Sequence, residues 1–173
     1  PGLDILELRA KARRMKKQHH IALIAIDYIQ LLTSGTKRAK DNRQIEIAEI
    51  SAGLKGLAKE LDLPLIVLAQ LNRQVEQRKG GRPMLSDLRE SGSIEQDADV
   101  VGLLTRADYA GSRQEDDERK RRDEEDDEDA KNRGESTLII AKNRNGPTDD
   151  VPLQFAGELM RFTEREGDHR PGD

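Results

Sequence analysis

The segment IALIAIDY at residues 21–28 is followed by the segment RQIEIAEISAGLKGLAKELDLPLIVLAQ at residues 43–70. Residues 21–26 and 64–69 are short, continuous apolar runs, which are typical of strands buried on both faces of a parallel sheet. Residues 43–61 repeat apolar side chains at spacings of three and four, which predicts an amphipathic helix. A strand, a helix and a further strand form the unit that connects parallel neighbours. We therefore expect an α/β fold with a parallel sheet and helical crossovers.

The rest of the sequence adds short elements on both sides of this unit. In chain order, the remaining predicted elements are a helix over residues 3–18, polar loops over 33–42 and 74–86, a short helix over 93–97, strands over 99–105 and 136–142, and a hairpin over 151–155 and 159–163. The hairpin is expected to form an antiparallel C-terminal edge of the sheet. The expected organisation is one domain over residues 1–163 and a flexible tail over residues 164–173.

Charge is concentrated in one part of the chain. Charged side chains make up 37% of the 173 residues, and the net charge is -4. Residues 114–129 alone hold eleven acidic and four basic side chains, so the remainder is close to neutral or slightly basic. Residues 108–135 have almost no apolar content and are expected to form a disordered insert. The acidic balance therefore describes this insert and leaves a nucleic-acid partner open for the rest of the surface.

The composition also excludes several classes of protein. The chain contains no cysteine, so a disulfide-stabilised secreted scaffold and a cysteine-based metal site are excluded. The longest apolar stretch, at residues 21–26, is too short to span a bilayer. We expect a protein of a reducing compartment, such as the cytoplasm, with no membrane partner.

Polar residues follow the two apolar runs. Asp27 ends the first run, which is the form of a Walker B strand, whose carboxylate holds Mg²⁺, commonly through water, beside nucleotide phosphates. Gln70 ends the second run, where a neutral amide could hydrogen-bond a γ-phosphate or the attacking water. If the two strands are neighbours, both side chains lie at one edge of the sheet. Taken alone, Asp27 could also be a loop or helix-cap residue, and Gln70 could simply cap a strand.

Two further segments carry features suited to phosphate. Gly92 permits unusual backbone angles and Ser93 begins a predicted helix, so exposed N–H groups there, with Arg89 beside them, could hold a phosphate of single-stranded DNA. Lys142 and Arg144 leave a predicted strand two positions apart, and two cations there suit phosphate charge as an arginine finger does. The alternatives are an ordinary capped turn for the first segment and a solvated strand end for the second.

Together, these segments resemble the RecA-type motor domain of replicative helicases of the DnaB type. The resembling segments are IALIAIDYIQLL, the block from residue 43 to residue 78, DLRESGSIEQDADVVGLLTR, LIIAKNRNGPT, VPLQF and RF. The middle block and SGSIEQDAD are specific to this family, whereas a Walker B strand alone is shared by very many NTPases. The resemblance implies a RecA-like fold, of which this chain is the C-terminal part.

The resemblance also implies roles for individual residues, with ATP and Mg²⁺ as cofactors. Asp27 would be the Walker B carboxylate, and Gln70 the sensor that couples nucleotide state to DNA. Arg89, Glu90 and Gly92 would lie on a DNA-binding loop that faces the central channel of a ring. Lys142 and Arg144 would be a finger pair that reaches the γ-phosphate bound by the adjacent subunit. The implied partners are single-stranded DNA, five further copies in a homo-hexamer, a primase and a helicase loader, at the bacterial replication fork.

The sequence departs from the family pattern in three respects, the first of which is the length and acidity of the insert at residues 108–135. Asp149 follows Thr148, where the pattern Gly-Pro-Thr ends in glycine. No G-x-x-x-x-G-K-[ST] segment occurs, and the family's catalytic glutamate lies upstream of the matching region. We therefore expect the parent protein to be an ATP-dependent helicase and the isolated chain to be inactive. One alternative is a non-catalytic helicase remnant that binds DNA or a helicase ring. A RecA-like recombinase or clock-type ATPase is disfavoured by SGSIEQDAD and KNRNGPT.

Overall fold

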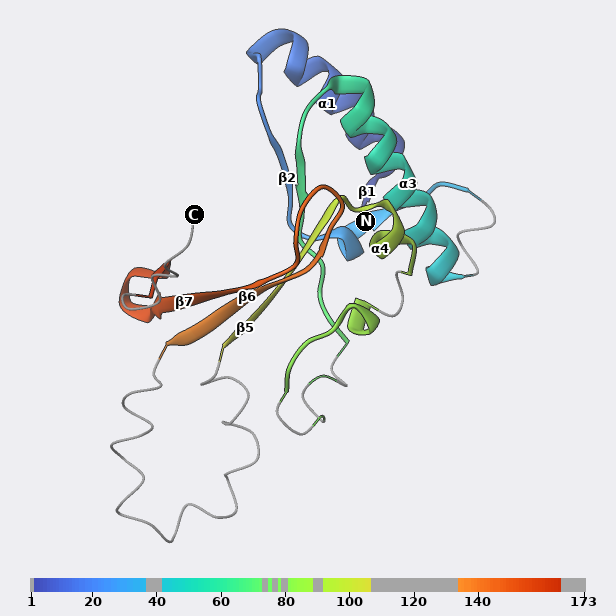
Figure 1. Ribbon diagram of the computed structural model, residues 1–173. Helices are drawn as coiled ribbons and strands as arrows, with labels where there is room; N and C mark the ends of the chain where they lie inside the picture. Colours follow the sequence, from blue (N-terminus) through green and yellow to red (C-terminus); the bar gives the residue numbers. More distant parts are fainter. Residues whose placement is uncertain are drawn as a thin grey trace, which may run out of the picture. The chain divides into compact units, whose positions relative to one another are not determined.

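Helix α3 (Arg43–Leu61) is the central element of the first of two units in the computed structural model (Figure 1). The structure describes residues 2–36, 42–72, 75, 78, 81–88, 92–106 and 134–165. The first unit comprises residues 1–72 and 85–98, and the second comprises residues 73–84 and 99–173. The bounds of α3 match the predicted helix. Asn42 begins it, because its side chain accepts hydrogen bonds from the backbone N–H groups of Gln44 and Ile45.

Helix α1 (Ile5–His19) packs beside α3. The prediction placed its start at residue 3, but Leu3–Asp4 form a short strand, β1, which pairs in parallel with β3 (Leu32–Thr33). The helix starts later because the Asp4 side chain accepts a hydrogen bond from the Leu6 N–H at 2.8 Å and so acts as the N-cap.

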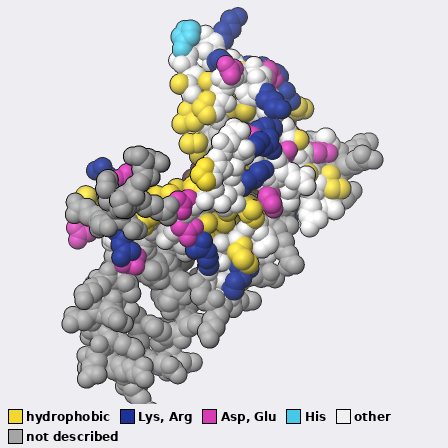
Figure 2. Space-filling model, viewed as in Figure 1, with side chains coloured by type: hydrophobic (Ala, Val, Ile, Leu, Met, Phe, Trp, Pro, Cys, Tyr) yellow, Lys and Arg dark blue, Asp and Glu magenta, His cyan; other side chains and the backbone are white. Residues whose placement is uncertain are grey.

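The two predicted central strands are parallel neighbours, as expected. Strand β2 (Ile24–Ile26) pairs with β4 (Leu65–Val67), and Ile26 lies opposite Val67. The predicted burial on both faces is wrong. Ile26 is 8% exposed on the face that packs on α1 and α3, whereas Ile66 and Leu68 are 52% and 51% exposed. The described helices of this unit cover one face of the pair, and Figure 2 shows hydrophobic side chains at the surface along β2.

The core of the first unit lies between this covered face and the two helices. Ile50 and Leu57 of α3 are fully buried there, together with Ile29 of the short helix η1 (Ile29–Leu31). The 3-10 helix η3 (Leu85–Leu88) and helix α4 (Gly92–Asp97) complete the unit, and Ile94 of α4 packs against the same core.

An ion-pair cluster links the outer faces of α1 and α3. Glu60 accepts hydrogen bonds from the guanidinium groups of Arg9 at 3.0 Å and Arg13 at 2.9 Å. The hydrogen bond from Arg13 and that from Arg9 lower the pKa of Glu60 from its ordinary value of 4.5 to about 2. Figure 2 shows Lys and Arg side chains along the surface formed by these helices.

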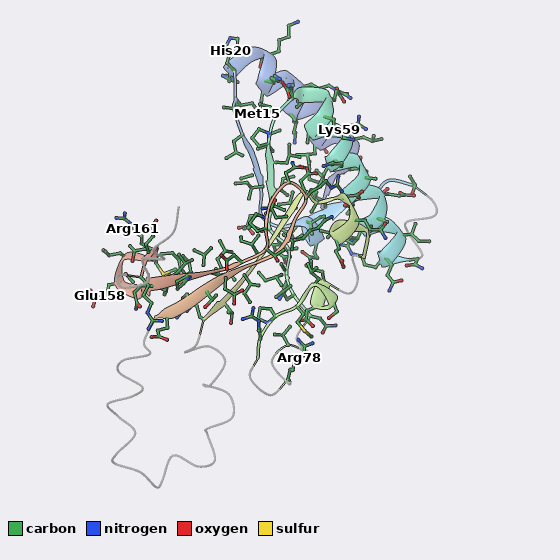
Figure 3. All side chains as sticks on the ribbon, in the orientation of Figure 1. Met15, His20, Lys59, Arg78, Glu158 and Arg161 are labelled. Carbon is green, nitrogen blue, oxygen red and sulfur yellow. The ribbon has the colours of Figure 1, made fainter. Side chains whose placement is uncertain are left out.

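We predict that Glu60→Gln lowers the melting temperature near pH 7. Because the pKa of Glu60 is lowered in the folded state, its stabilising effect is complete above about pH 4.5 and is lost as pH falls toward 2. The difference in melting temperature between the two proteins should therefore shrink between pH 5 and pH 2. Glu158→Gln, at an exposed site in the turn after β7 (Figure 3), is the control and should show no such trend. A difference independent of pH would contradict this assignment.

The second unit is an antiparallel sheet of four strands. In spatial order these are β5 (Val100–Arg106), β6 (Glu135–Asn143), β7 (Asp150–Ala156) and β8 (Arg161–Glu164), with the 3-10 helix η4 (Gly157–Leu159) between the last two. The predicted hairpin is confirmed as β7 and β8. The antiparallel part is larger than predicted, because β5 and β6 also pair antiparallel. The segment between them carries no helical apolar pattern, and strands joined without a helical crossover pair in this way.

The ends of this sheet correct two predicted boundaries. Glu135 was assigned to the disordered insert, but it is the first residue of β6 and pairs with Gln154. Glu164 was assigned to the tail, but it is the last residue of β8, and the next side chain, Arg165, forms an ion pair with Glu135 at 2.7 Å. Pairing to β7 extends both strands, although their polar residues resemble loop residues in sequence. Insert residues 108–133 and tail residues 166–173 lie outside the described residues.

Candidate functional site

The carboxyl ends of β2 and β4 bring together two of the residues singled out in the sequence. Beyond the regular strands, the Leu68 N–H donates to the Ile26 carbonyl and the Ile29 N–H donates to the Leu68 carbonyl, both at 2.9 Å. Asp27 and Gln70 follow these paired backbones and are exposed. The two strands are neighbours, which is the condition under which both side chains were expected at one edge of the sheet. Ligands of open parallel sheets bind at this edge.

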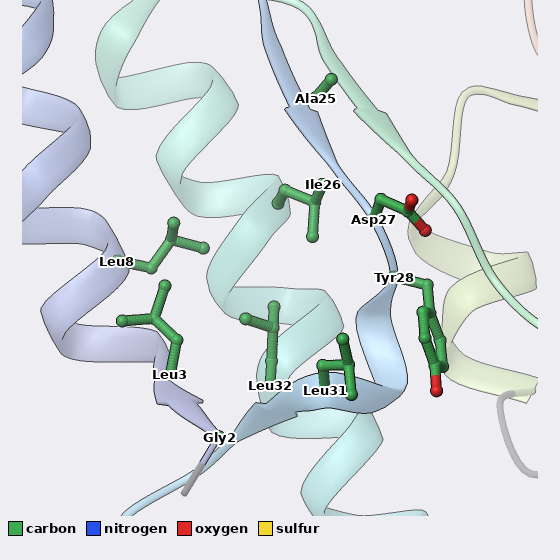
Figure 4. Close-up of a pocket in the computed structure, with 9 residues that line it drawn as sticks. All are labelled: Gly2, Leu3, Leu8, Ala25, Ile26, Asp27, Tyr28, Leu31 and Leu32. Atoms are coloured by element: carbon green, nitrogen blue, oxygen red, sulfur yellow. The ribbon is translucent and has the colours of Figure 1, made fainter.

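A pocket of about 590 Å³ lies beside the end of β2 (Figure 4). Its lining residues are Gly2, Leu3, Leu8, Ala25, Ile26, Asp27, Tyr28, Leu31 and Leu32. Figure 4 shows the Asp27 carboxylate directed away from Leu3 and Leu8, so most of this pocket has apolar walls. Such walls suit an apolar group, whereas a phosphate together with its Mg²⁺ would need the polar side of the strand, where the carboxylate could hold the ion.

Asp27 fits the chemistry of a magnesium–nucleotide site. Mg²⁺ commonly keeps several waters and is held by one or two carboxylates together with the substrate phosphates. One exposed carboxylate at a strand end meets that requirement. Within the described residues, no group of three or more histidine, cysteine, aspartate or glutamate side chains could hold a metal by itself. Asp27 is thus suited to share a metal with phosphates and water, and the described part of the chain contains no closed metal cage.

The backbone of Gln70 is held by a residue that the sequence analysis did not single out. The Gln30 side-chain amide donates from Nε2 to the Gln70 carbonyl at 3.2 Å, and its Oε1 accepts from the Gln70 N–H at 3.3 Å. The available signal was a single polar residue inside the apolar run YIQLL at residues 28–32, just after Asp27. A polar side chain in such a run usually has a specific partner.

The segment predicted to bind DNA is described in part. Arg89 and Glu90 lie outside the described residues, and Gly92 is the first residue of α4. Gly92 was singled out because glycine permits unusual backbone angles, but in the structure it is helical and its φ is not positive. An added Cβ would meet no atom within 4 Å there, so neither strain nor crowding requires glycine at this position.

Helix α4, which follows this segment, is held against α3. The Ser51 hydroxyl of α3 donates to the Asp97 carboxylate at 2.6 Å, and Ser51 is 6% exposed. Because the bond is charge-assisted and partly buried, it fixes the C-terminal end of α4. The position of Gly92 is thus set by a helix with a core contact through Ile94 and a polar contact through Asp97.

Lys142 and Arg144 lie at the end of β6 in the second unit. Lys142 pairs with Val101 of β5, and Arg144 follows the last strand residue. The Arg144 N–H donates to the Asp99 carbonyl at 2.8 Å, and its guanidinium forms an ion pair with the Asp99 carboxylate at 3.2 Å. The Arg144 side chain is 49% exposed, and ion pairs exposed to this extent contribute little to stability.

The turn after Arg144 contains the departure from the family pattern. The Asn143 side-chain amide donates to the Pro147 carbonyl at 3.1 Å and accepts from the Asn145 N–H at 3.3 Å. At Asp149, the carbonyl accepts from the Ile140 N–H at 2.7 Å, and the carboxylate accepts from the Asp150 N–H at 2.8 Å. Asp149 therefore pairs with β6 through its backbone just before β7, and its side chain stabilises this turn by accepting from the next N–H.

The fold of the described residues is that of a RecA-like ATPase domain. Among solved structures, the ATPase domain of a related protein is similar to 95% of this chain, with a TM-score of 0.77 and 39% sequence identity. A DnaB-like replicative helicase, described with its interactions with primase, gives the same TM-score, identity and coverage of this chain. The family model of the DnaB-like helicase C terminal domain matches residues 1–164. The chain belongs to this family.

Curated relatives are similar over nearly the whole chain. The replicative DNA helicase DnaC of Bacillus subtilis is 47% identical over 96% of this chain, and the replicative DNA helicase DnaB of Mycobacterium leprae is 48% identical over 94%. The chain spans 33% and 24% of the length of these two relatives, and 52% of the solved ATPase domain. In the part of the chain that the structure describes, no helix has the length and apolar content needed to cross a membrane.

Proposed function

We propose that this chain supplies the C-terminal half of the motor of an ATP-dependent replicative DNA helicase, which translocates on single-stranded DNA and unwinds the duplex at the fork. The observation that carries the proposal is the pairing of β2 with β4, which sets Asp27 and Gln70 on neighbouring strand ends within a chain of the DnaB-like family. This is the edge at which a RecA-like sheet receives a nucleotide.

Each residue has a defined part in the proposed hydrolysis. When bound, Mg²⁺ neutralises charge on the nucleotide phosphates. Asp27 orients that ion, commonly through water, and Gln70 hydrogen-bonds the γ-phosphate or the attacking water. Lys142 and Arg144 act in trans, on the γ-phosphoryl group held by the adjacent subunit of a homo-hexamer, where their charge stabilises the transition state. Upstream residues outside this chain would supply the P-loop and the catalytic glutamate.

DNA enters the proposal through the segment before α4. Arg89, Glu90 and Gly92 are assigned to a loop that contacts single-stranded DNA in the central channel of the ring. Backbone N–H groups and an arginine are suited to phosphate oxygens and carry no base preference. The proposed cellular place is the cytoplasm, at the replication fork of a bacterial nucleoid, with a primase and a helicase loader as further partners.

The direct test joins this chain to the P-loop half of the Bacillus subtilis relative and measures ATP hydrolysis with and without single-stranded DNA. Turnover stimulated by DNA is the expected result. A folded and hexameric chimera that hydrolyses no ATP would favour the non-catalytic remnant, and Asp149 would then be the first residue to revert to glycine.

A second test concerns the DNA loop. Arg89→Ala in the same chimera should weaken single-strand binding and lower the slope of log affinity against log salt by about one, because one phosphate contact is lost. The slope is measured by fluorescence anisotropy of labelled single strands over a salt series. Lys59→Ala removes one exposed positive charge from α3 and should leave the slope unchanged. An unchanged slope for Arg89→Ala would remove this residue from the contact surface.

A further inference from the structure

We propose that Gln30 is a positioning residue, whose side-chain amide fixes the backbone of the sensor Gln70 against the Walker B segment. The inference rests on the proposed function, because it assigns a purpose to the position of Gln70. Gln30 is half-buried and belongs to η1, which begins two residues after Asp27. One short segment thus contains both the metal-orienting carboxylate and the residue that holds the sensor.

The argument begins with the place where β2 and β4 stop pairing through their backbones. The last regular partners are Ile26 and Val67, and the Ile29 N–H still reaches the Leu68 carbonyl at 2.9 Å. At Ile29 the chain turns into η1, so its backbone leaves the neighbouring strand. A strand residue beyond this point would lack a partner for its N–H and its carbonyl on that side.

The Gln30 amide takes that place. A primary amide offers an N–H donor and a carbonyl acceptor on one plane, as a peptide unit does. It donates to the Gln70 carbonyl at 3.2 Å and accepts from the Gln70 N–H at 3.3 Å. The ladder is therefore extended past Leu68 by a side chain, up to the residue that bears the sensor amide.

Gln30 is itself anchored from two directions. Its backbone carbonyl accepts a hydrogen bond from Arg43 Nη2 at 2.6 Å, and Arg43 is the first residue of α3. Its neighbour Ile29 is 1% exposed in the core of the unit. The amide thus projects from a segment held by core packing and by the start of a long helix. A positioning residue needs a rigid backbone, because a side chain on a mobile segment cannot hold its partner in the catalytic geometry.

The contact acts on position more than on stability. Gln70 is exposed, so water can replace both hydrogen bonds when Gln30 is changed, and the net effect on folding is small. Catalysis is more sensitive, because a shift of about 1 Å in a catalytic group can lower a rate by about 10²-fold. Loss of the clamp should therefore appear in turnover and in local exchange rather than in the melting temperature.

Two variants separate the two hydrogen bonds. Gln30→Met keeps the length of the side chain and removes both, whereas Gln30→Glu keeps the acceptor for the Gln70 N–H and removes the donor to its carbonyl. Gln44→Met, at an exposed site in the first turn of α3, is the matched control. Amide hydrogen exchange of Gln70, measured by NMR on the 173-residue chain, reports the clamp without reference to ATP.

We expect faster exchange of the Gln70 amide in Gln30→Met and retained protection in Gln30→Glu. In the chimera with the P-loop half, Gln30→Met should lower DNA-stimulated kcat by about tenfold or more while KM for ATP changes little, since the P-loop provides most of the contacts that bind the phosphates. Gln44→Met should match the unchanged chain in both measurements. Equal melting temperatures for all four proteins would show that the loss in kcat is not a loss of fold.

The outcomes distinguish the inference from the proposed function. Unaltered exchange in Gln30→Met overturns the clamp itself. Faster exchange with unaltered kcat, in a chimera whose unchanged form turns over, overturns the positioning role and leaves the helicase proposal intact. No DNA-stimulated turnover in the unchanged chimera overturns the proposed function and, with it, any sensor role for the clamped residue.

Discussion

Replacing Arg144 by alanine will lower DNA-stimulated ATP hydrolysis of the chimeric ring by about 10³-fold or more, because arginine fingers contribute about 10³ to 10⁵ in turnover. Nucleotide affinity should be retained, since a trans-acting finger belongs to the subunit next to the one that binds ATP. In the structure the Arg144 backbone is fixed by the Asp99 carbonyl at 2.8 Å, while its half-exposed guanidinium meets the Asp99 carboxylate at 3.2 Å. The backbone is thus held by a hydrogen bond, while the charged end is half-exposed.

The measurement compares single-turnover hydrolysis with equilibrium binding of a fluorescent nucleotide. Arg161→Ala is the matched control, because Arg161 is an exposed arginine of the same sheet, on β8 (Figure 3). It should leave both quantities unchanged. Loss of nucleotide binding in Arg144→Ala would contradict a finger that acts in trans, and turnover equal to that of the unchanged ring would remove Arg144 from catalysis.

The second large effect is expected for Asp27→Asn. This change keeps the shape of the side chain and removes the charge that orients Mg²⁺ at the end of β2. Metal-ion stabilisation of a phosphoryl transition state contributes several kcal/mol, so hydrolysis should fall by about 10²-fold or more. Part of the loss should be recovered at high Mg²⁺ concentration if the effect is weaker binding of the ion.

Turnover against Mg²⁺ concentration is the measurement for this second change. Asp62→Asn provides the control, because Asp62 lies before β4, at the opposite end of the strand pair, and asparagine tolerates its left-handed backbone. That variant should follow the unchanged curve. A curve for Asp27→Asn that coincides with the unchanged one would falsify the Walker B assignment.

The sequence predicted the elements best where their signals are local. Helix α3 matches the predicted range 43–61, because the apolar repeat that predicts it lies within one continuous segment. The prediction was weaker for the apolar runs. Residues 64–69 suggested a strand buried on both faces, yet Ile66 and Leu68 are about half exposed. A short apolar run does not predict which faces of the strand are buried, because the elements that cover each face are distant in the chain.

In the candidate site, too, local sequence signals were informative and contacts between distant residues were not predicted. Asp27 and Gln70 were selected because each ends an apolar run, and the structure confirms that their strands are neighbours. Gly92 was singled out because glycine permits unusual backbone angles, and it is an ordinary helical residue. Gln30 was missed, because its meaning depends on a contact with a residue forty positions away. The roles assigned to Arg89, Glu90, Lys142 and Arg144 stay predictions.

By itself, the sequence determined the range of helix α3, the order of the main helices and strands, and the family to which the chain belongs. These properties depend on periodicity and motif spacing, which act over short stretches of chain. Only the tertiary structure decided that Ile26 lies opposite Val67, that Gln30 takes the place of a peptide unit beside Gln70, and that the Asp99 carbonyl holds the Arg144 backbone. Such pairings arise when buried faces dock and bring distant polar groups within hydrogen-bonding distance, which no local pattern specifies.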